Sequence, residues 1–583
     1  MGAHVVILGG GIGGMTAAHE LIERGFDVTV YEARSVPGGK ARSTSKPNSA
    51  SPGRRLLPGE HGFRFFPGFY RHLIDTLRRI PYKNSKHGVL DNLIETTRIQ
   101  IALAGRPCLT TLARFPRSLR DVEVLLEGTR EFFTSSGLTY ADIDFYERRI
   151  WQLMTSCEER RDEEYQQIGW WEFIAASTQS EAYQTVLGGM TRSLVAAQPT
   201  LACTRTVGDI LLQMMFNLAT PGVGTDRVLN GPTNDVWIDP WRCHLEALGV
   251  DYRVNAKVEA IHCKGGRISG ARINESGRIT EVGGEYFVAA LPVEVMALLL
   301  TDDMLEIDPT LQTICILQQD VAWMTGIQFY LKKDVRLEHG HQLFSDSPWA
   351  LTSLSQAQFW QGTVDLGKDY GDGTVHGILS VDISDWHRPG LFKKAAIDCT
   401  KEEIAQEVWA QLKKGLNSPV EVLLDSDLHS WNLDDDILIG SVQLGKPINM
   451  EPLLVNRANR WSMRPPAHTG IPNLFLAADY VRTFTDLATM EGANEAARRA
   501  VNGILNASGS PKSPCRLWKL HEPWVLAPWR WADARRYAKG LPWRGKFPWI
   551  LEVSQRVFIR AVPLLIRLTR WARRLGFDAM FGR

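Results

Sequence analysis

The chain has 583 residues, more than one hydrophobic core usually organises, so two or three domains are expected. Hydrophobic residues make up 44% and charged residues 22% of the sequence, which excludes a wholly disordered chain. The net charge of +1 excludes a molecule that attracts nucleic acid over its whole surface. Charge is instead local: residues 516–583 hold 15 Lys or Arg and 4 Asp or Glu, so this segment carries +11 and the rest −10.

Cysteine usage and hydropathy indicate the compartment. The eight cysteines are scattered, with no CxxC pair and no metal-ligand spacing, so a reduced cytoplasmic protein without a metal site is expected. The first residues lack the charged and apolar regions of a secretory signal. No apolar run reaches the roughly 18 residues that a membrane span needs. The sequence therefore predicts a protein that does not cross a membrane.

The first predicted elements are a strand, a glycine-rich turn, a helix and a second strand. His4–Leu8 is a short apolar run, Gly9–Gly14 fits the pattern GxGxxG, an amphipathic helix follows from Met15, and Asp27–Tyr31 forms the next strand. In such a unit the first glycine permits the tight turn, the second lets a pyrophosphate approach the backbone, and the third allows close packing of helix and strand. Glu32 follows the second strand at the position that binds ribose hydroxyls. These residues predict a dinucleotide site, for either NAD or FAD.

Two segments that follow point to the flavin cofactor. Residues 32–43 read EARSVPGGKARS and place two glycines, Lys40 and Arg42 just after Glu32. Residues 57–80 contain Glu-His-Gly-Phe-Arg before an aromatic helix. Both resemble the FAD-binding segments of the flavin-containing amine oxidase and phytoene desaturase superfamily, and a solvated surface turn is the alternative for the first. His61 and Arg64 are candidate catalytic residues, although a histidine in such a turn is as often structural.

The middle of the chain contains two predicted kinds of structure. Residues 98–229 are mostly of helical pattern and rich in aromatic residues and Met, which suits either a lipid-like substrate or an ordinary core. Residues 231–292 read as a helix, hairpins and a strand, and 323–335 and 376–386 as strands of an antiparallel sheet that forms the floor of a substrate domain. The order of these elements resembles the same superfamily, in which the residue matching Val258 contacts the adenine.

A second specific signal lies in residues 471–505. Leu474–Ala477 is predicted to be a strand, Asp479 follows it, and Met490-Glu491-Gly492-Ala493 begins a helix that reaches Leu505. The carboxylate of Asp479 can hold a ribityl hydroxyl, and N–H groups at the start of the helix can stabilise negative charge at the flavin N1/O2 edge. The stretch resembles plant- and cyanobacterial-type carotene desaturases, with Ala478 and Thr489 in place of their glycine and serine.

The resemblance implies the fold and the cofactor site. It implies an α/β protein with a discontinuous Rossmann-like FAD-binding domain (1–97, 230–300 and 466–507), a mixed α+β substrate domain (a helical part at 98–229 and a sheet part at 301–465) and a tail (508–583). FAD is expected to be non-covalent, since no cysteine is placed to tether it. The predicted FAD contacts are Gly9, Gly11, Gly13, Gly14, Glu32, Ala33, Arg34, Gly39, Lys40, Arg42, Gly62, Phe63, Arg64, Val258, Asp479, Met490, Gly492 and Ala493.

The tail predicts a contact with the membrane surface. It holds seven tryptophans, and Arg556–Arg574 is a predicted amphipathic helix. Its apolar members are Val557, Phe558, Ala561, Leu564, Leu565, Leu568 and Trp571, and its arginines are Arg560, Arg567, Arg570 and Arg574. Pro563 kinks this helix or marks its first turn. Basic helices with Trp are typical of peripheral membrane binding through the interface. The alternatives are a helix packed on the acidic body of the protein or a contact between subunits.

Three functions remain open from the sequence. The resemblance favours a carotene desaturase-like enzyme that transfers hydride from a long apolar isoprenoid or lipid substrate to flavin N5, with a membrane quinone as a candidate electron acceptor. The same scaffold also supports isomerisation and dehydroxylation of isoprenoids. The second function is a soluble flavin amine or amino-acid oxidase that uses O₂, and the third is a flavin-bearing partner whose tail docks another protein. Nucleic acid is not expected as a partner.

Overall fold

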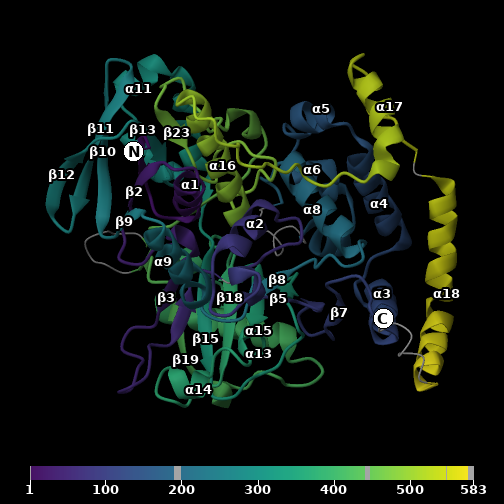
Figure 1. Cartoon of the computed structure of the whole chain (residues 1–583). Helices are drawn as coiled ribbons and strands as arrows, with labels where there is room; N and C mark the ends of the chain where they lie inside the picture. Colours follow the sequence, from purple (N-terminus) through teal and green to yellow (C-terminus); the bar gives the residue numbers. More distant parts are fainter. Residues whose placement is uncertain (1, 63, 190–198, 440–446, 547, 576–583) are drawn as a thin grey trace.

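The computed structural model describes residues 2–62, 64–189, 199–439, 447–546 and 548–575 (Figure 1). It has an α/β fold built around two sheets, which confirms the predicted fold class. The first sheet lies beside α1 and α16, the second lies below it in Figure 1, and a group of helices covers one side of both. The chain ends in two tail helices at the edge of this helical group.

The first sheet is parallel and draws on distant parts of the sequence. Its strand order is β23-β13-β1-β2-β9, and each neighbouring pair is parallel. Its strands are β1 (His4–Leu8), β2 (Asp27–Tyr31), β9 (Asp251–Arg253), β13 (Tyr286–Ala289) and β23 (Leu474–Leu476). These strands come from all three segments that the sequence assigned to one discontinuous domain. Their apolar runs are continuous because both faces of a parallel sheet are covered.

Helices from both ends of the sequence cover this sheet. They are α1 (Ile12–Ile22), α2 (His72–Arg79), α9 (Asp239–Ala247) and α16 (Met490–Ala507). Helices α1 and α16 pack against each other, and α2 packs on α16. A separate antiparallel sheet of β10 (Ala256–Lys264), β11 (Arg267–Glu275) and β12 (Arg278–Val282) contains the predicted hairpins. The nucleotide turn between β1 and α1 therefore lies next to elements more than four hundred residues away.

The second sheet contains the two segments predicted as strands of an antiparallel sheet, but it is mixed, since β16 and β6 pair in parallel. Its strand order is β19-β15-β18-β17-β16-β6-β7. Its strands are β6 (Arg98–Ala102), β7 (Leu109–Leu112), β15 (Thr325–Leu331), β16 (Gln342–Phe344), β17 (Leu351–Ser355), β18 (Gly377–Ile383) and β19 (Leu428–Leu433). One face packs on α15 (Lys401–Leu416) through residues such as Val381, Ile404 and Val408. The other face is left for the cavity described below.

The structure differs from the expected helical segment at 98–229. Residues 98–112 form β6 and β7, and β8 (Arg227–Leu229) pairs with β5 (Leu93–Glu95). The alternating pattern of RIQIA has the period of a strand, and its pairing with β16 decides the structure. The helices proper are α3 (Leu119–Ser135), α4 (Tyr140–Thr155), α5 (Glu158–Arg160), α6 (Trp170–Phe173) and α8 (Thr204–Leu218). Trp151 and Trp170 are buried in the core, whereas Met215 is 39% exposed.

The tail crosses the protein surface and ends in two helices, α17 (Ala527–Tyr537) and α18 (Trp549–Arg574). Helix α18 begins seven residues before the predicted start, and Pro563 lies inside it rather than in its first turn. No helix in the described part of the chain combines the length and apolarity that crossing a membrane requires.

Candidate functional site

A cavity of about 540 Å³ runs from the β1–α1 turn to the second sheet. Its volume is typical of a cofactor or ligand site. The turn, the segment after β2, the segment after β4 (Pro58–Glu60), helix α8, the second sheet and the segments around β23 and α16 all contribute residues to its wall. The cavity thus joins the nucleotide-binding turn to the predicted substrate floor.

The turn at one end leaves no space for side chains. Gly9 has φ +107°, and a Cβ on Gly14 would lie 1.9 Å from the carbonyl oxygen of Gly9. A Cβ on Gly13 would lie 1.8 Å from the oxygen of Ala477, at the end of β23. At Gly11 the nearest atom would be 3.5 Å away, so its backbone faces open space in the cavity wall. The N-terminus of α1 carries no side-chain cap, which leaves its N–H groups and positive dipole end for phosphates.

Glu32 sits beside this turn at the end of β2. Its Oε2 accepts a hydrogen bond from Gly10 N at 2.8 Å and its Oε1 accepts one from Arg34 N at 2.9 Å. Burial raises the pKa of Glu32, against these two backbone hydrogen bonds. The carboxylate lines the cavity and retains lone pairs for ribose hydroxyls. The uncapped helix, the open Gly11 and this carboxylate together fit the adenosine and pyrophosphate of FAD.

The basic residues near the turn are held by acids rather than left exposed. Arg34 pairs with Glu451 at 2.5 Å and with Asp436 at 2.9 Å, and Arg42 pairs with both acids. Lys40 pairs with Glu294 at 3.0 Å and donates to the carbonyl of Pro452. Arg42 is 4% exposed and is not in the cavity wall, whereas Arg34 and Lys40 are. Arg42 therefore links Asp436 and Glu451 to the FAD end of the cavity.

His61 forms a buried pair with Asp434. The Nδ1 atom of His61 and the Oδ2 atom of Asp434 are in hydrogen-bond contact, and the Asp434 side chain is fully buried. Burial alone would raise the pKa of Asp434, but the hydrogen bond and charge of His61 outweigh it and lower the pKa. His61 lines the cavity, and its Nε2 is buried with no hydrogen-bond partner in the described part of the chain. The carboxylate thus favours the tautomer with a proton on Nδ1 and a lone pair on Nε2.

Arg64 lies beside this pair. Its guanidinium donates to the carbonyls of Lys40, Ala41 and Arg42. Burial lowers its pKa, while the charges of Glu60 and Asp382 act in the opposite direction. The liganding atoms of His61, Asp434 and Asp436 lie within 4.8 Å of one another. Because Arg34 and Arg42 already bind Asp436, these residues form an ion-pair network, which disfavours a cation there.

The residues of the Met-Glu-Gly-Ala stretch lie on two sides of α16. Met490 and Ala493 line the cavity, as does Asp479 before them. Gly492 does not line it; its N–H is capped by Thr489 Oγ1 at 3.2 Å. Glu491 points the other way and accepts hydrogen bonds from the N–H groups of Arg71, His72 and Leu73 at 2.8–2.9 Å. Glu491 therefore caps the N-terminus of α2, whose N–H groups would otherwise have no partner.

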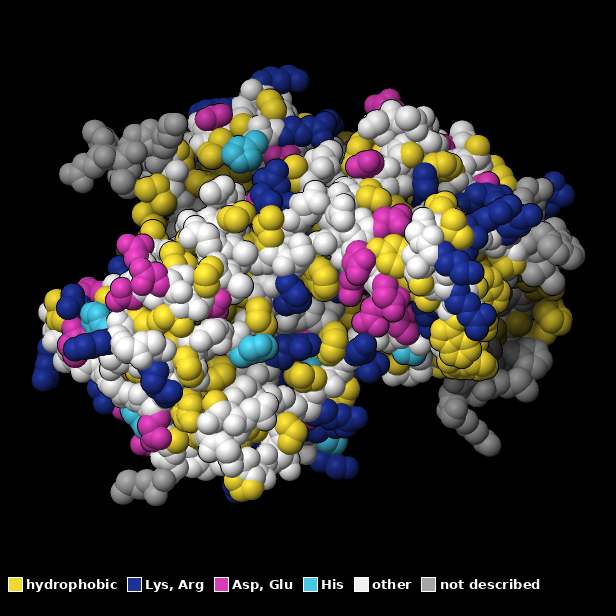
Figure 2. Space-filling view, turned by 90° about the horizontal axis from the view of Figure 1, so that it is seen from above, with side chains coloured by type: hydrophobic (Ala, Val, Ile, Leu, Met, Phe, Trp, Pro, Cys, Tyr) yellow, Lys and Arg dark blue, Asp and Glu magenta, His cyan; other side chains and the backbone are white. Residues whose placement is uncertain are grey.

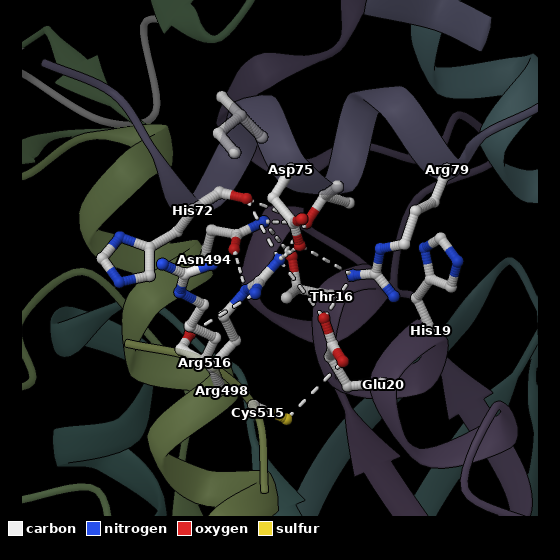
Figure 3. Close-up of polar contacts among 12 residues, drawn as sticks. Thr16, His19, Glu20, His72, Asp75, Arg79, Asn494, Arg498, Cys515 and Arg516 are labelled. Carbon is white, nitrogen blue, oxygen red and sulfur yellow. Dashed lines mark hydrogen bonds and ion pairs between the residues drawn. The ribbon is translucent and has the colours of Figure 1, made fainter. Parts of the chain in front are cut away.

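A buried polar network continues behind α16 (Figure 3). His72 Nδ1 lies 2.7 Å from Glu491 Oε1, and His72 Nε2 accepts from the backbone N–H of Trp518 at 3.0 Å. Arg498, 2% exposed, donates to Asp75 and lies 3.3 Å from Glu20 on α1. The network joins α1, α2, α16 and the start of the tail, so it holds the FAD end of the cavity rigid.

The other end of the cavity mixes apolar and polar side chains. Gly326 of β15, Asp382 of β18, Thr352 of β17 and Leu343 of β16 are cross-strand neighbours in one row. Asp382, Thr352 and Leu343 line the cavity, as do Ser384, Ile99 and His341. Helix α8 contributes Val207 and Met214, and the segment before β8 contributes Thr225 and Asp226. An apolar molecule with a polar group can therefore be accommodated beyond the FAD end.

The structure brings most of the predicted cofactor residues together. The cavity wall contains Gly9, Gly11, Gly13, Glu32, Ala33, Arg34, Gly39, Lys40, Gly62, Arg64, Val258, Asp479, Met490 and Ala493, together with the catalytic candidate His61. Gly14, Arg42 and Gly492 are outside the wall and act through packing, ion pairs and the helix start. Phe63 lies outside the described residues. Whether each residue touches FAD stays a prediction.

Several cavity residues were not predicted from the sequence. Asp226, His341 and Glu294 line the cavity, and Asp434 pairs with the cavity residue His61. All four lie in segments without a recognisable motif, and only the fold brings them to these places. Asp382 did carry a signal, because it interrupts an apolar strand with a charge. A charge at such a position in a central strand requires a partner or a site.

Comparisons with known proteins identify the family. Residues 12–505 match the model of the flavin containing amine oxidoreductases. A zeta-carotene desaturase of Synechococcus elongatus is 28% identical over 139 residues, which are 24% of this chain and about a quarter of the relative. Cyclohexylamine oxidase from Brevibacterium oxydans has a TM-score of 0.56 at 14% identity, covering 87% of this chain and 100% of that one.

A second solved structure gives a similar result. A putrescine oxidase solved with putrescine bound has a TM-score of 0.57 at 14% identity, covering 87% of this chain and 99% of that one. At such identities the solved structures establish the fold alone. The family match spans most of the chain and, with the cradle around Gly11 and Glu32, identifies FAD as the cofactor. The protein is a member of the flavin-containing amine oxidoreductase family.

Proposed function

We propose that the protein is a desaturase- or dehydrogenase-like enzyme that oxidises a long apolar substrate, an isoprenoid or another lipid, with non-covalent FAD. The observation that carries this proposal is the apolar part of the cavity wall, formed by residues such as Ile99, Val207, Met214 and Leu343. Such side chains contribute free energy by removing hydrocarbon from water. The match to a zeta-carotene desaturase supports the same substrate class, and a membrane quinone is the proposed electron acceptor.

Bound FAD supplies the two-electron acceptor for a substrate C–H bond. The chain provides the surroundings. The N–H groups at the start of α16, beside Met490 and Ala493, favour negative charge at the edge of the cofactor. We assign His61 Nε2 the role of proton acceptor, because Asp434 holds the Nδ1 proton and Nε2 has no hydrogen-bond partner among the described residues of this cavity-lining side chain. Apolar residues of the cavity wall, such as Ile99, Val207 and Met214, exclude water from the substrate end.

An amine or amino-acid oxidase that uses O₂ is the second candidate. The solved structures that share this fold include two amine oxidases. Asp226 and Asp382 in the cavity wall also provide negative charge that an ammonium group would contact. This function predicts release of peroxide with amines and no need for lipid.

We further propose that the tail places the enzyme on the cytoplasmic surface of a membrane. One face of α18 is docked: Val562 and Ile566 are buried against Leu126 of α3. On the same helix, Arg570 pairs with Glu123 at 2.9 Å and with Glu127, and Arg573 pairs with Glu123. The sequence had placed Leu565 with the outward residues, but it is half-buried toward α3. The alternative, in which the tail helix packs on the acidic body of the protein, therefore accounts for only one face of α18.

The opposite face of α18 is exposed and apolar. Val557, Leu564, Leu568, Trp571 and Leu575 are 50–61% exposed and recur at helical spacing on one side. Arg560, Arg567 and Arg574 are exposed along the edge of this stripe. On α17 and the turn before it, Trp524 and Trp531 are 83% and 68% exposed. Apolar and basic side chains also gather at this end of the molecule in Figure 2. Apolar residues with Trp and a basic border suit an anionic lipid surface.

The test of the proposed function is the identity of a bound lipid. Holoprotein is purified, extracted with organic solvent, and the extract is analysed by mass spectrometry. A co-purifying isoprenoid or polyene is the expected result. An extract that contains only a short polar amine, together with peroxide release on amine addition, would contradict the proposal and favour the second candidate.

A further inference from the structure

One part of the cavity wall carries polar side chains that a pure hydrocarbon would leave without partners. Thr225 and Asp226 precede β8 and face the same cavity as Val207 and Met214. Both are buried, at 3% exposure each. The Oγ1 atom of Thr225 and the Oδ1 atom of Asp226 are buried and have no hydrogen-bond partner among the described residues. A buried polar atom without a partner is rare in native structures, which calls for a ligand at this place.

The rest of the Asp226 side chain is well held. Its Oδ2 accepts a hydrogen bond from Thr96 Oγ1 at 2.9 Å and lies 2.7 Å from His341 Nδ1. Thr96 and the backbone of Asp226 are joined by a further hydrogen bond of 3.0 Å. The carboxylate is therefore fixed through one oxygen only. Oδ1 belongs to a residue of the cavity wall and is the carboxylate oxygen that has no protein partner among the described residues.

We propose that the substrate carries a hydroxyl group that donates a hydrogen bond to Asp226 Oδ1, so that the enzyme acts on an amphiphilic isoprenoid or lipid alcohol rather than on a hydrocarbon. This inference rests on the proposed function. Binding a hydrocarbon would seal the carboxylate oxygen in an apolar site without a donor, which costs free energy. A hydroxyl supplies that donor, and it can accept in turn from Thr225 Oγ1.

Local charge favours a neutral donor over an ammonium group. Arg227 follows Asp226 in the chain, is largely buried and interacts electrostatically with it. Burial lowers the pKa of Arg227, and the charge of Asp226 opposes that shift. The arginine charge compensates the carboxylate, so little net negative charge is left to attract a cation. Recognition of a buried hydroxyl is also strongly selective, since a ligand without it leaves the site unpaired.

Binding of three matched probes to the oxidised holoprotein tests this inference. The probes are geranylgeraniol, the primary amine with the same skeleton, and the hydrocarbon with the same skeleton. Affinity is read from the change in flavin absorbance on titration. We expect the wild-type protein to bind the alcohol about tenfold or more tighter than the hydrocarbon, and tighter than the amine.

Two variants assign that preference to the site. Asp226→Asn should remove most of the preference for the alcohol, because it weakens binding of the alcohol and removes the charge that a hydrocarbon leaves without a donor. Thr225→Val, a milder change, should reduce the preference less. The matched control is Asp251→Asn, at a carboxylate that is 49% exposed and is not part of the cavity wall. Flavin content and melting temperature report whether each variant is folded, and Thr225→Val carries the test if Asp226→Asn is not.

The outcomes separate this inference from the proposed function. Equal affinity for the alcohol and the hydrocarbon, or an unchanged preference in Asp226→Asn, would overturn the assignment of the hydroxyl site. Tighter binding of the amine would also overturn it. If none of the three probes perturbs the flavin of a folded wild-type holoprotein, it is the long apolar substrate class itself that fails.

Discussion

The two ends of the cavity differ in what forms their walls: backbone at the FAD end and side chains at the substrate end. At the FAD end the contacts come largely from the backbone of Gly9–Gly14, and added side chains would meet atoms at 1.8–2.4 Å at several positions. At the substrate end the wall is made of side chains from β15, β16, β17, β18 and α8, with hydrogen bonds and unpaired atoms among them. Backbone contacts tolerate almost no substitution, whereas a wall of side chains can change its ligand by single replacements. The cofactor site is therefore formed by the backbone of the fold, whereas the substrate is specified by a few side chains.

The largest expected effect is at the backbone-built end. Gly13→Ala would place a Cβ 1.8 Å from the carbonyl oxygen of Ala477, so α1 and β23 must separate. We expect loss of FAD binding and a large drop in melting temperature. Gly283→Ala is the matched control, because a Cβ there has no atom within 4 Å. FAD content and thermal unfolding are measured for both variants. A Gly13→Ala protein with normal flavin content would contradict the claim that backbone contacts form the FAD end.

A large effect is also expected behind the FAD end, at the cap of α2. Glu491→Gln removes a buried charge that binds three N–H groups and His72, which should cost about 3–5 kcal/mol of unfolding free energy. Glu402→Gln, on the exposed side of α15, should be close to neutral. Denaturant unfolding at pH 7 measures the difference. Equal stability of the two variants would show that the cap that Glu491 forms on α2 does not stabilise the FAD end of the cavity.

The carboxyl group of Glu491 also predicts that the free energy of unfolding depends on pH. Burial alone would raise the pKa of Glu491, but the hydrogen bonds from His72 and from backbone N–H groups lower it below its ordinary value. A carboxylate with a lowered folded pKa contributes stability above the unfolded pKa of about 4.3, and this is lost as the pH falls through the folded pKa. Glu491→Gln should therefore show a shallower loss of stability in acid than the wild type. Parallel pH profiles would contradict this assignment.

At the substrate end, His61→Gln should lower turnover by about 10²–10⁴ while FAD content stays normal, because the proposed role of the side chain is that of a proton acceptor and not of a cofactor contact. His262→Gln, an exposed histidine on β10, is the control. Rates of flavin reduction and ¹⁵N chemical shifts of the His61 ring, with Nδ1 protonated and Nε2 bare, measure the two aspects. Wild-type turnover in His61→Gln would remove His61 from the mechanism.

The smallest effects are expected at the tail, which is outside the cavity. Leu564→Glu and Leu568→Glu should each weaken binding to anionic vesicles by about tenfold or more, since each removes an apolar side chain worth about 1.5–3 kcal/mol on burial. Leu298→Glu changes an 81% exposed leucine elsewhere and should have no effect. Flotation with phosphatidylserine vesicles compares them. Unchanged flotation of the tail variants would point to another occupant of this face, such as a second copy or a partner protein.

The difference between the two ends also explains what could be predicted. Gly9–Gly14, Glu32 and Met490–Ala493 could be predicted because local backbone chemistry demands those residue types at fixed spacing. Asp434, Asp226 and His341 could not, because their partners lie far away in sequence: His61 is 373 residues from Asp434. The role of Glu491 was missed for the same reason, since the start of α2 is decided by packing on α16. In the tail, the spacing predicted an amphipathic helix, but contacts with α3 decided which apolar residues face outward.

Anaerobic reduction of the bound flavin distinguishes the two candidate functions in one measurement. Holoprotein in anionic vesicles is mixed without oxygen with a long isoprenoid alcohol, and in parallel with putrescine and cyclohexylamine, while flavin absorbance is followed. We predict that the isoprenoid bleaches the flavin and that the amines do not. Rapid bleaching by the amines, with no response to the isoprenoid, would contradict the assignment of a long apolar substrate.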